Sequence, residues 1–322
     1  MSGSYHNVSA DWIGNRGGIF RDDRNSRRRH GFARSHPIKV GGVKMNLADY
    51  LKRIDYQGPV TPDLDCLKAI HHQHLLNIPY ENVDVQLRRP LDLDLERIFE
   101  KIVHRRRGGW CYEMNGLLDW ALRQIGFDVM RLTGGVSRKE KGDEVLGNHL
   151  VLNVNLDEPY IADVGLGNGL VEPIPLRQDR FRQGYREFRL ELLDDEIWRF
   201  HNFPGAIPLD FDFIFGPADE ALLSRTCSSL QSDPDSMFRQ NLICQRLRSD
   251  GVHLLLGRVL IFFSESGQTK TVLNSAEELN DTLLSVFGLS DGDTLELWPD
   301  VVARHEVLFG ESVPDPLSSS HD

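Results

Sequence analysis

Residues 105–116 read RRRGGWCYEMNG, a basic, glycine-containing turn that leads directly into an amphipathic segment. Across residues 111–125, apolar residues recur at intervals of three and four, which predicts a helix with one buried face, and Gly126 follows where such a helix ends. Cys111 is therefore expected at a helix N-terminus. The helix dipole and the arginines at 105–107 would favour a thiolate there, so we interpret Cys111 as a nucleophile, with a buried structural cysteine as the alternative.

The composition is that of a soluble globular protein large enough for two or three compact units. The chain has 322 residues, 40% of them hydrophobic, and no apolar run approaches the length of a membrane-spanning helix. Its four cysteines are widely spaced, which predicts neither a zinc site nor a disulfide framework. We therefore expect a cytoplasmic protein without a bound metal or a membrane partner.

The first 44 residues differ in charge from the rest of the chain. They carry nine Lys or Arg against three Asp, a net charge of +6. Because the whole chain has a net charge of −11, the remaining residues carry a net charge of −17. Residues 1–44 lack an apolar signal core and helical periodicity, which predicts a disordered basic leader, with Met45 as an alternative start. The acidic remainder argues against a nucleic-acid partner, because such surfaces must neutralise phosphates.

Helical signals fill residues 45–126, which we predict to be a helical bundle. The first expected helix covers residues 47–54, and the third covers 95–103. The helix between them is expected to have Asp63 as its N-cap, to contain Leu64, Leu67, Ile70 and Leu75, and to end at Pro79. This second helix contains His71, His72 and His74. They are expected on different faces without carboxylates at ligand spacing, so we predict packing or capping roles instead of a metal site.

The period changes after Gly126, and residues 127–234 are predicted to form a β-barrel. Short β-type runs occur at residues 129–136, 150–156, 160–164, 188–193 and 198–203. Alternation places His149 on the opposite face from Leu150. A hairpin turn at residues 157–159 would bring Asp163 within a position or two of His149.

Cys111, His149 and Asp163 are the three parts of a Cys-His-Asp triad in a workable chain order. The imidazole would take the thiol proton, the carboxylate would hold the ring in the productive tautomer, and the thiolate would attack a carbonyl carbon. Gly165-Leu166-Gly167-Asn168-Gly169 follows directly. No helical pattern follows this segment, so its glycines are expected to allow close backbone approach to a ligand or to turn the chain.

The last third is predicted to be a small α/β unit over residues 235–309, followed by a disordered tail at 310–322. Helices or connectors are expected at 219–229 and 235–241, strands at 245–256 and 258–263, and a helix at 275–287. The whole pattern predicts an α+β fold.

Together, four motifs resemble those of the arylamine N-acetyltransferase family. They are RGGWC at 107–111 with Glu113 and Asn115, IPYEN at 78–82, NHL at 148–150 and DVG at 163–165. The resemblance implies three domains, namely a helical bundle, a β-barrel and an α/β lid, with a cysteine-protease-like arrangement of Cys111, His149 and Asp163. It also implies acetyl-CoA as co-substrate, an arylamine or hydrazine as acceptor, and no metal.

The resemblance further implies roles for residues around the triad. Arg107 and Glu81 would pair to support the cysteine turn, and Gly165 and Gly167 would lie near CoA. The family usually has an aromatic residue at the position of Leu166, so an aromatic wall of the acceptor pocket is expected to be missing. Papain-like proteases and transglutaminases use the same three residue types in the same order, so a function of either kind is an alternative. A catalytically silent binding protein is a further alternative.

Overall fold

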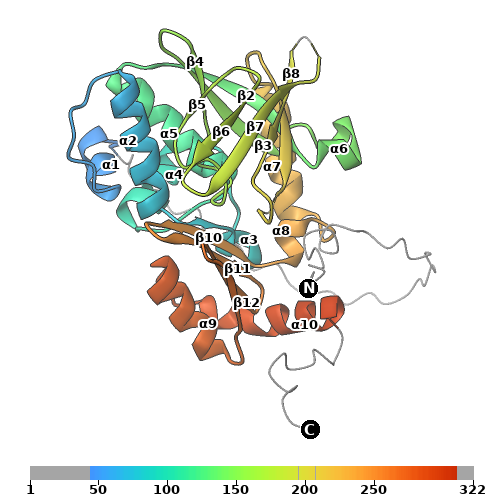
Figure 1. The fold of residues 1–322 in the computed structure, drawn as a ribbon. Helices are drawn as coiled ribbons and strands as arrows, with labels where there is room; N and C mark the ends of the chain where they lie inside the picture. The colour runs from blue at the N-terminus through green and yellow to red at the C-terminus, as the bar shows by residue number, and fades with distance from the viewer. Residues whose placement is uncertain (1–43, 195, 207, 310–322) are drawn as a thin grey trace.

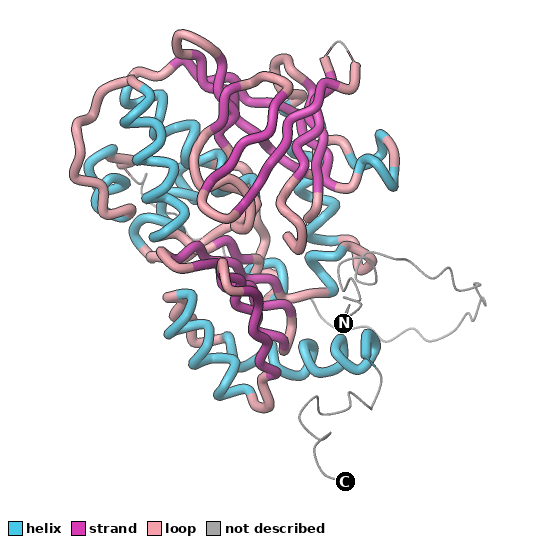
Figure 2. The backbone as a smooth tube through the Cα atoms, viewed as in Figure 1, coloured by secondary structure: helices cyan, strands magenta, loops and turns pink. Residues whose placement is uncertain are grey.

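The α+β architecture consists of two antiparallel sheets with helices packed against both of them (Figure 1). The computed structural model describes residues 44–194, 196–206 and 208–309; the tail at 310–322, and the leader except for its last residue, lie outside them. Figure 2 shows the two groups of strands as separate sheets, with helices packed beside the larger sheet and below the smaller one. No helix in the described ranges is long and apolar enough to cross a membrane.

Helices make up most of the N-terminal part of the chain, and Asn46, Asp63 and Asp94 provide side-chain caps for three of them. The helices are α1 (Leu47–Arg53), α2 (Leu64–Asn77), α3 (Val83–Gln86), α4 (Leu95–Phe99) with a π turn at Glu100–His104, and α5 (Cys111–Ile125). The carboxylate of Asp63 accepts a hydrogen bond from the backbone of Cys66 at 2.9 Å, as expected of an N-cap. Gly126 ends α5 at a φ of 108°, a conformation that suits glycine.

Helix α5 is more deeply buried than its sequence indicates. Residues 111–122 are all buried, whereas the apolar periodicity predicted a single buried face. The reason is its central position, since α5 contacts α1 and α4 on one side and strands β2 (Asp128–Val136) and β3 (His149–Asn155) on the other. Its polar side chains are consequently hydrogen-bonded inside the protein.

The larger sheet is antiparallel and barrel-like, with the strand order β5-β4-β3-β2-β9-β8-β7-β6. Its remaining strands are β4 (Pro159–Ala162), β5 (Ile174–Pro175), β6 (Asp179–Gln183), β7 (Arg186–Leu192), β8 (Ile197–His201) and β9 (Asp210–Ile214). A short helix, α6 (Arg138–Lys141), follows β2. Phe188, Phe200, Phe211 and Phe213 fill the interior, so the barrel is a packed core.

The smaller sheet has the order β1-β10-β11-β12-β13. Its strands are β1 (Tyr80–Glu81), β10 (Ile243–Arg248), β11 (Gly251–Leu256), β12 (Val259–Ser264) and β13 (Gly267–Val272). The single strand predicted at 245–256 was wrong. The turn-forming sequence Ser249-Asp250-Gly251 divides it into the β10–β11 hairpin.

Helices surround the smaller sheet. They are α7 (Glu220–Ser232), α8 (Met237–Gln240), α9 (Ala276–Thr282) with a π turn at Leu283–Phe287, a 3-10 turn at Thr294–Leu297, and α10 (Trp298–Phe309). Cys244 and Leu255 pack against α9 on one face of the sheet. Ile243 and Leu254 face Trp110 and Cys111 on the other.

The cysteine turn is continuous with the smaller sheet. Tyr80 pairs with Gln245, and Gly109 adds a parallel bridge to Tyr80 on the other side. The segment predicted as a helical bundle therefore supplies an edge strand to the sheet of the C-terminal unit. Cys111 begins α5 two residues after Gly109, the residue that forms the parallel bridge.

Candidate active site

Cys111 is buried at the first position of α5, with 3% of its surface exposed. Its Sγ lies 3.7 Å from the carbonyl oxygen of Asn148, the residue before His149. The helix start is fixed by Tyr112, whose hydroxyl donates to the carbonyl of Gly147 at 2.6 Å. These contacts bring the N-terminus of α5 against the start of β3.

Burial raises the pKa of the Cys111 thiol, and the backbone N–H groups of Leu150 and Tyr112 oppose that shift only in part. The expectation that three arginines would favour the thiolate is therefore wrong. Arg105 and Arg106 are exposed, and Arg107 binds carboxylates instead of facing the sulfur. An ionised sulfur at this position consequently needs a base that takes its proton.

His149 and Asp163 form a buried hydrogen-bonded pair. The Nε2 atom of His149 lies 2.8 Å from Oδ2 of Asp163, and the two side chains are 1% and 2% exposed. The register of β3 with β4 pairs Leu152 with Ala162, which places Asp163 opposite Val151. Val151 is two positions from His149 and on the same face of the strand, so Asp163 lies within the one or two positions predicted from the hairpin. Since Nε2 binds the carboxylate, Nδ1 is the ring nitrogen left for proton transfer.

Asp163 is held as a carboxylate. Burial works against its charge, but His149 and hydrogen bonds from Asn115 and Gly165 outweigh it and lower the pKa. The side-chain amide of Asn115 donates to Oδ1 of Asp163 at 2.8 Å and to the carbonyl of Leu150 at 2.6 Å. Asn115 also accepts the backbone N–H of Val164 at 2.9 Å. One α5 side chain thus ties together the segments that carry His149 and Asp163.

The glycines after Asp163 allow the chain to approach its neighbours closely. A Cβ at position 165 would lie 2.5 Å from Nδ2 of Asn115 and 2.9 Å from Cα and Cβ of Cys111. Gly167 has a φ of 63°, and a Cβ there would lie 2.6 Å from Oε1 of Gln245. Close packing therefore explains why glycine is needed at both positions. Their contact with CoA stays a prediction.

Leu166 lies between these glycines and points into the barrel. It is 6% exposed and packs in the same core cluster as Val151 and Phe203. Its influence on acceptor choice also stays a prediction.

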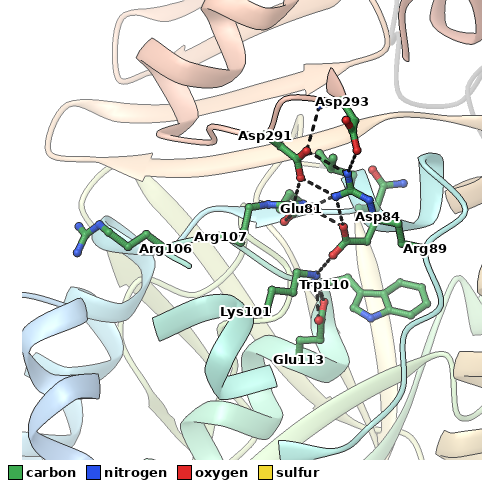
Figure 3. A network of polar contacts seen from close by, with 12 residues as sticks. Glu81, Asp84, Arg89, Lys101, Arg106, Arg107, Trp110, Glu113, Asp291 and Asp293 are labelled. Atoms are coloured by element: carbon green, nitrogen blue, oxygen red, sulfur yellow. Dashed lines mark hydrogen bonds and ion pairs between the residues drawn. The ribbon is translucent and has the colours of Figure 1, made fainter. Parts of the chain in front are cut away.

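A network of buried charges lies beneath the cysteine turn (Figure 3). Nη2 of Arg107 lies 2.9 Å from Oε1 of Glu81, the pair implied by the family resemblance. The Nζ atom of Lys101 lies 2.9 Å from both Asp84 and Glu113. The Oε2 atom of Glu113 also accepts the backbone N–H of Trp110 at 3.2 Å, so the network extends to the residue before the nucleophile.

The network reaches across to the C-terminal part of the chain. Asp291 lies 2.5 Å from Arg107 and 2.6 Å from Arg89. Arg89 also pairs with Asp84 and Asp293. Sequence reasoning missed Lys101, Asp84 and Asp291, because nothing in their local pattern distinguishes them from solvent-exposed charges.

The three histidines of α2 do not meet at a common site. His71 contacts the Asp163 segment, whereas Nδ1 of His74 lies 3.0 Å from the hydroxyl of Tyr50. Within the described ranges, no three His, Cys, Asp or Glu side chains are arranged to hold a metal ion.

Comparisons with known proteins agree on one family. A family model described as N-acetyltransferase matches residues 63–293. An arylamine N-acetyltransferase of Mycolicibacterium smegmatis is 35% identical over 78% of this chain and 94% of that protein. The liver isozyme of arylamine N-acetyltransferase from Gallus gallus is 29% identical over 76% of this chain and 96% of that protein.

Solved structures give the same result. The Mycobacterium smegmatis arylamine N-acetyltransferase superposes with a TM-score of 0.72 at 31% identity, covering 80% of this chain and 98% of that one. A Mycobacterium marinum arylamine N-acetyltransferase in complex with CoA gives 0.72 at 28% identity, covering 82% and 99%. The α+β fold expected from the sequence is confirmed, and the chain belongs to the arylamine N-acetyltransferase family, a family of acyltransferases.

Proposed function

We propose that this chain transfers an acetyl group from acetyl-CoA to the amino group of arylamines or arylhydrazines, through an acetylated Cys111. The observation that carries the proposal is the buried His149–Asp163 pair next to a cysteine at a helix N-terminus. Membership of the family supports the reaction, and the CoA complex of the M. marinum relative supports the co-substrate.

In the first half-reaction, His149 takes the proton of the Cys111 thiol as the sulfur attacks the thioester carbonyl. The backbone N–H of Tyr112, near the sulfur, is a candidate donor to the developing oxyanion. The carbon–sulfur bond to CoA breaks, and the departing thiolate takes the proton from the imidazolium. The product is a thioester on Cys111.

In the second half-reaction, the nitrogen of the amine attacks the acetyl-Cys111 carbonyl and gives a proton to His149. The Cys111 sulfur leaves and takes that proton back, so the enzyme returns to its starting state. Asp163 remains ionised and holds the ring by accepting its Nε2–H. Because CoA leaves before the amine reacts, ping-pong kinetics are expected.

Supporting residues have roles in the same proposal. Arg107 and Glu81 brace the turn before Cys111 without touching substrate, which suits a pair that is almost completely buried. Gly165 and Gly167 would lie beside bound CoA. The four cysteines are free and buried, which supports a reducing compartment such as the cytoplasm.

Mass spectrometry after incubation with acetyl-CoA alone tests the nucleophile. One acetyl group is expected on the peptide that contains Cys111, absent from Cys111→Ala and strongly reduced in His149→Ala. Cys227→Ala is the matched control, because Cys227 is buried in the same apolar cluster but is not the proposed nucleophile. Adding an arylamine should remove the acetyl group and yield the N-acetyl product.

Other outcomes would favour the rival readings. Hydrolysis of a casein-like substrate or glutamine–amine crosslinking, without any need for acetyl-CoA, would indicate a protease or a transglutaminase. A wild-type protein that gains no acetyl group and shows no selective alkylation of Cys111 would indicate a binding protein.

A further inference from the structure

His71 on α2 connects the two ends of the loop that carries Asp163. Its Nε2 atom lies 3.2 Å from the backbone nitrogen of Asp163, and its Nδ1 atom lies 3.1 Å from the carbonyl oxygen of Val171. The side chain is completely buried. The loop between these two contacts contains Gly165 and Gly167, which pack against Cys111 and Gln245 respectively.

The two partners determine the protonation of the His71 ring. A backbone N–H can only donate, so Nε2 must be unprotonated, and a carbonyl can only accept, so Nδ1 must carry the hydrogen. Burial lowers the pKa of His71 to about 4, which agrees with a neutral ring. Protonation would place an N–H group on Nε2 against the N–H of Asp163 and break that contact.

Asp163 is consequently held from two helices. Asn115 on α5 binds its carboxylate and the N–H of Val164, and His71 on α2 binds its own backbone N–H. The carboxylate direction depends on this backbone, and the orientation of the His149 ring depends on the carboxylate. A shift of the backbone at Asp163 would therefore turn the imidazole that serves Cys111.

We propose that His71 is a positioning residue for acetyl transfer, which fixes the backbone of Asp163 and through it the orientation of His149. This inference rests on the proposed function of the triad. The hydrogen bonds of His71 go to the backbone of Asp163 and Val171, so its effect on His149 passes through Asp163.

His74 provides a matched control on the same helix. It is also completely buried, and its Nδ1 also makes one hydrogen bond, but the partner is the hydroxyl of Tyr50 in α1. Replacing either histidine removes a buried ring and its polar contact. Only the replacement of His71 alters the support of Asp163.

The test compares His71→Leu, His71→Gln, His74→Leu and His74→Gln in the full chain. The rate of Cys111 acetylation by acetyl-CoA is measured in single turnovers, together with the pH profile of Cys111 alkylation by iodoacetamide. His71→Leu should slow acetylation about 10-fold or more and move the alkylation profile to higher pH, because His149 is misdirected. His74→Leu should lose about as much resistance to urea as His71→Leu. Its folded fraction should keep the wild-type rate of Cys111 acetylation and the wild-type pH profile of alkylation.

His71→Gln should recover part of the rate, because its amide oxygen can accept the N–H of Asp163. Equal rates in folded His71→Leu and His74→Leu would overturn the proposal, as would no recovery in His71→Gln relative to His71→Leu. Should His71→Leu not fold, ¹⁵N spectra of the wild type decide, since an imidazolium or an Nε2–H tautomer at His71 near neutral pH would overturn it. A wild-type protein that is never acetylated on Cys111 would instead overturn the proposed function.

Discussion

At the scale of single residues, the main feature is the burial of the Cys111 thiol, which disfavours its ionised form. Burial raises its pKa, and the backbone N–H groups of Tyr112 and Leu150 recover only part of the shift. The backbone N–H groups at the helix N-terminus therefore do not fully offset the effect of burial on the thiol. In the proposed mechanism the thiol proton passes to His149, so the reactivity of Cys111 is expected to depend on the geometry of these two side chains.

This dependence predicts the effect of His149→Gln on alkylation. At neutral pH, iodoacetamide should label Cys111 about 100-fold more slowly in the variant, because the base is lost and the buried thiol keeps its proton. The rate in the variant should rise only at high pH, in the direction of the raised thiol pKa. Rates are followed by mass spectrometry, with Cys111→Ala as the blank, and equal rates in variant and wild type would contradict the assigned base.

Gly165→Ala tests the close approach beside Cys111. The new Cβ would lie 2.5 Å from Nδ2 of Asn115, which cannot move without releasing Asp163. We expect the kcat/KM for acetyl transfer to fall about 100-fold, as for other small displacements of a reacting group. Gly216→Ala is the control, since nothing lies within 4 Å of its added Cβ.

The sequence predicts the proposed triad better than the residues that support it. Cys111, His149 and Asp163 lie within 53 positions, in patterns of helix and strand that are visible locally. His71 and Asp291 reach the same region from distant segments, and their neighbours in sequence give no sign of it. Their roles depend on tertiary contacts, which periodicity does not encode.

At the scale of elements, the loop at residues 290–293 is anchored to the cysteine turn through arginines. Asp291 binds Arg107 and Arg89, and its side chain is only 10% exposed. Among the described ion pairs, Asp293 binds only Arg89, and its side chain is 56% exposed. Neutralising Asp291 would therefore remove a counter-charge from two arginines, whereas neutralising Asp293 would remove one from Arg89.

Asp291→Asn and Asp293→Asn form a matched pair. Asp291→Asn should reduce the free energy of unfolding by about 3 kcal/mol, because it leaves the buried Arg107 guanidinium short of a counter-charge. Asp293→Asn should cost less than about 1 kcal/mol, as is usual for exposed ion pairs. Urea unfolding of both variants checks the difference, and similar losses would contradict the structural distinction.

The strands that surround the site are predictable because their side chains alternate. The runs at 129–136 and 150–156 correspond to β2 and β3. By contrast, β6 and β13 were not predicted, since exposed polar residues dominate both and no apolar alternation marks them. These edge strands take their structure from pairing with neighbours.

At the scale of the whole molecule, buried neutral histidines couple stability to pH. Burial lowers the pKa of His74 well below its usual value. The unfolded chain therefore binds more protons than the folded one as the pH falls through about 6.5, so this group destabilises the fold on acidification. Glu113 acts with the opposite sign over a similar range, because burial raises its pKa to about 7.

Comparing variants isolates the histidine contribution. The stability advantage of the wild type over His74→Gln should shrink by roughly 2 kcal/mol between about pH 7 and about pH 5, because only the wild-type unfolded state gains the proton. Urea unfolding at the two pH values measures it. The exposed His104→Gln serves as the reference, and a constant difference between wild type and His74→Gln would show that His74 is not buried neutral.

The edge pairing of Tyr80 with Gln245 has a consequence for the newborn chain. While a ribosome is still making the protein, Tyr80 and Gly109 emerge long before β10 exists to receive them. The turn before Cys111 therefore lacks β10 as its neighbour until most of the chain has been translated. If Cys111 is the nucleophile, as proposed, it is expected to accept an acetyl group only after β10 has been synthesised.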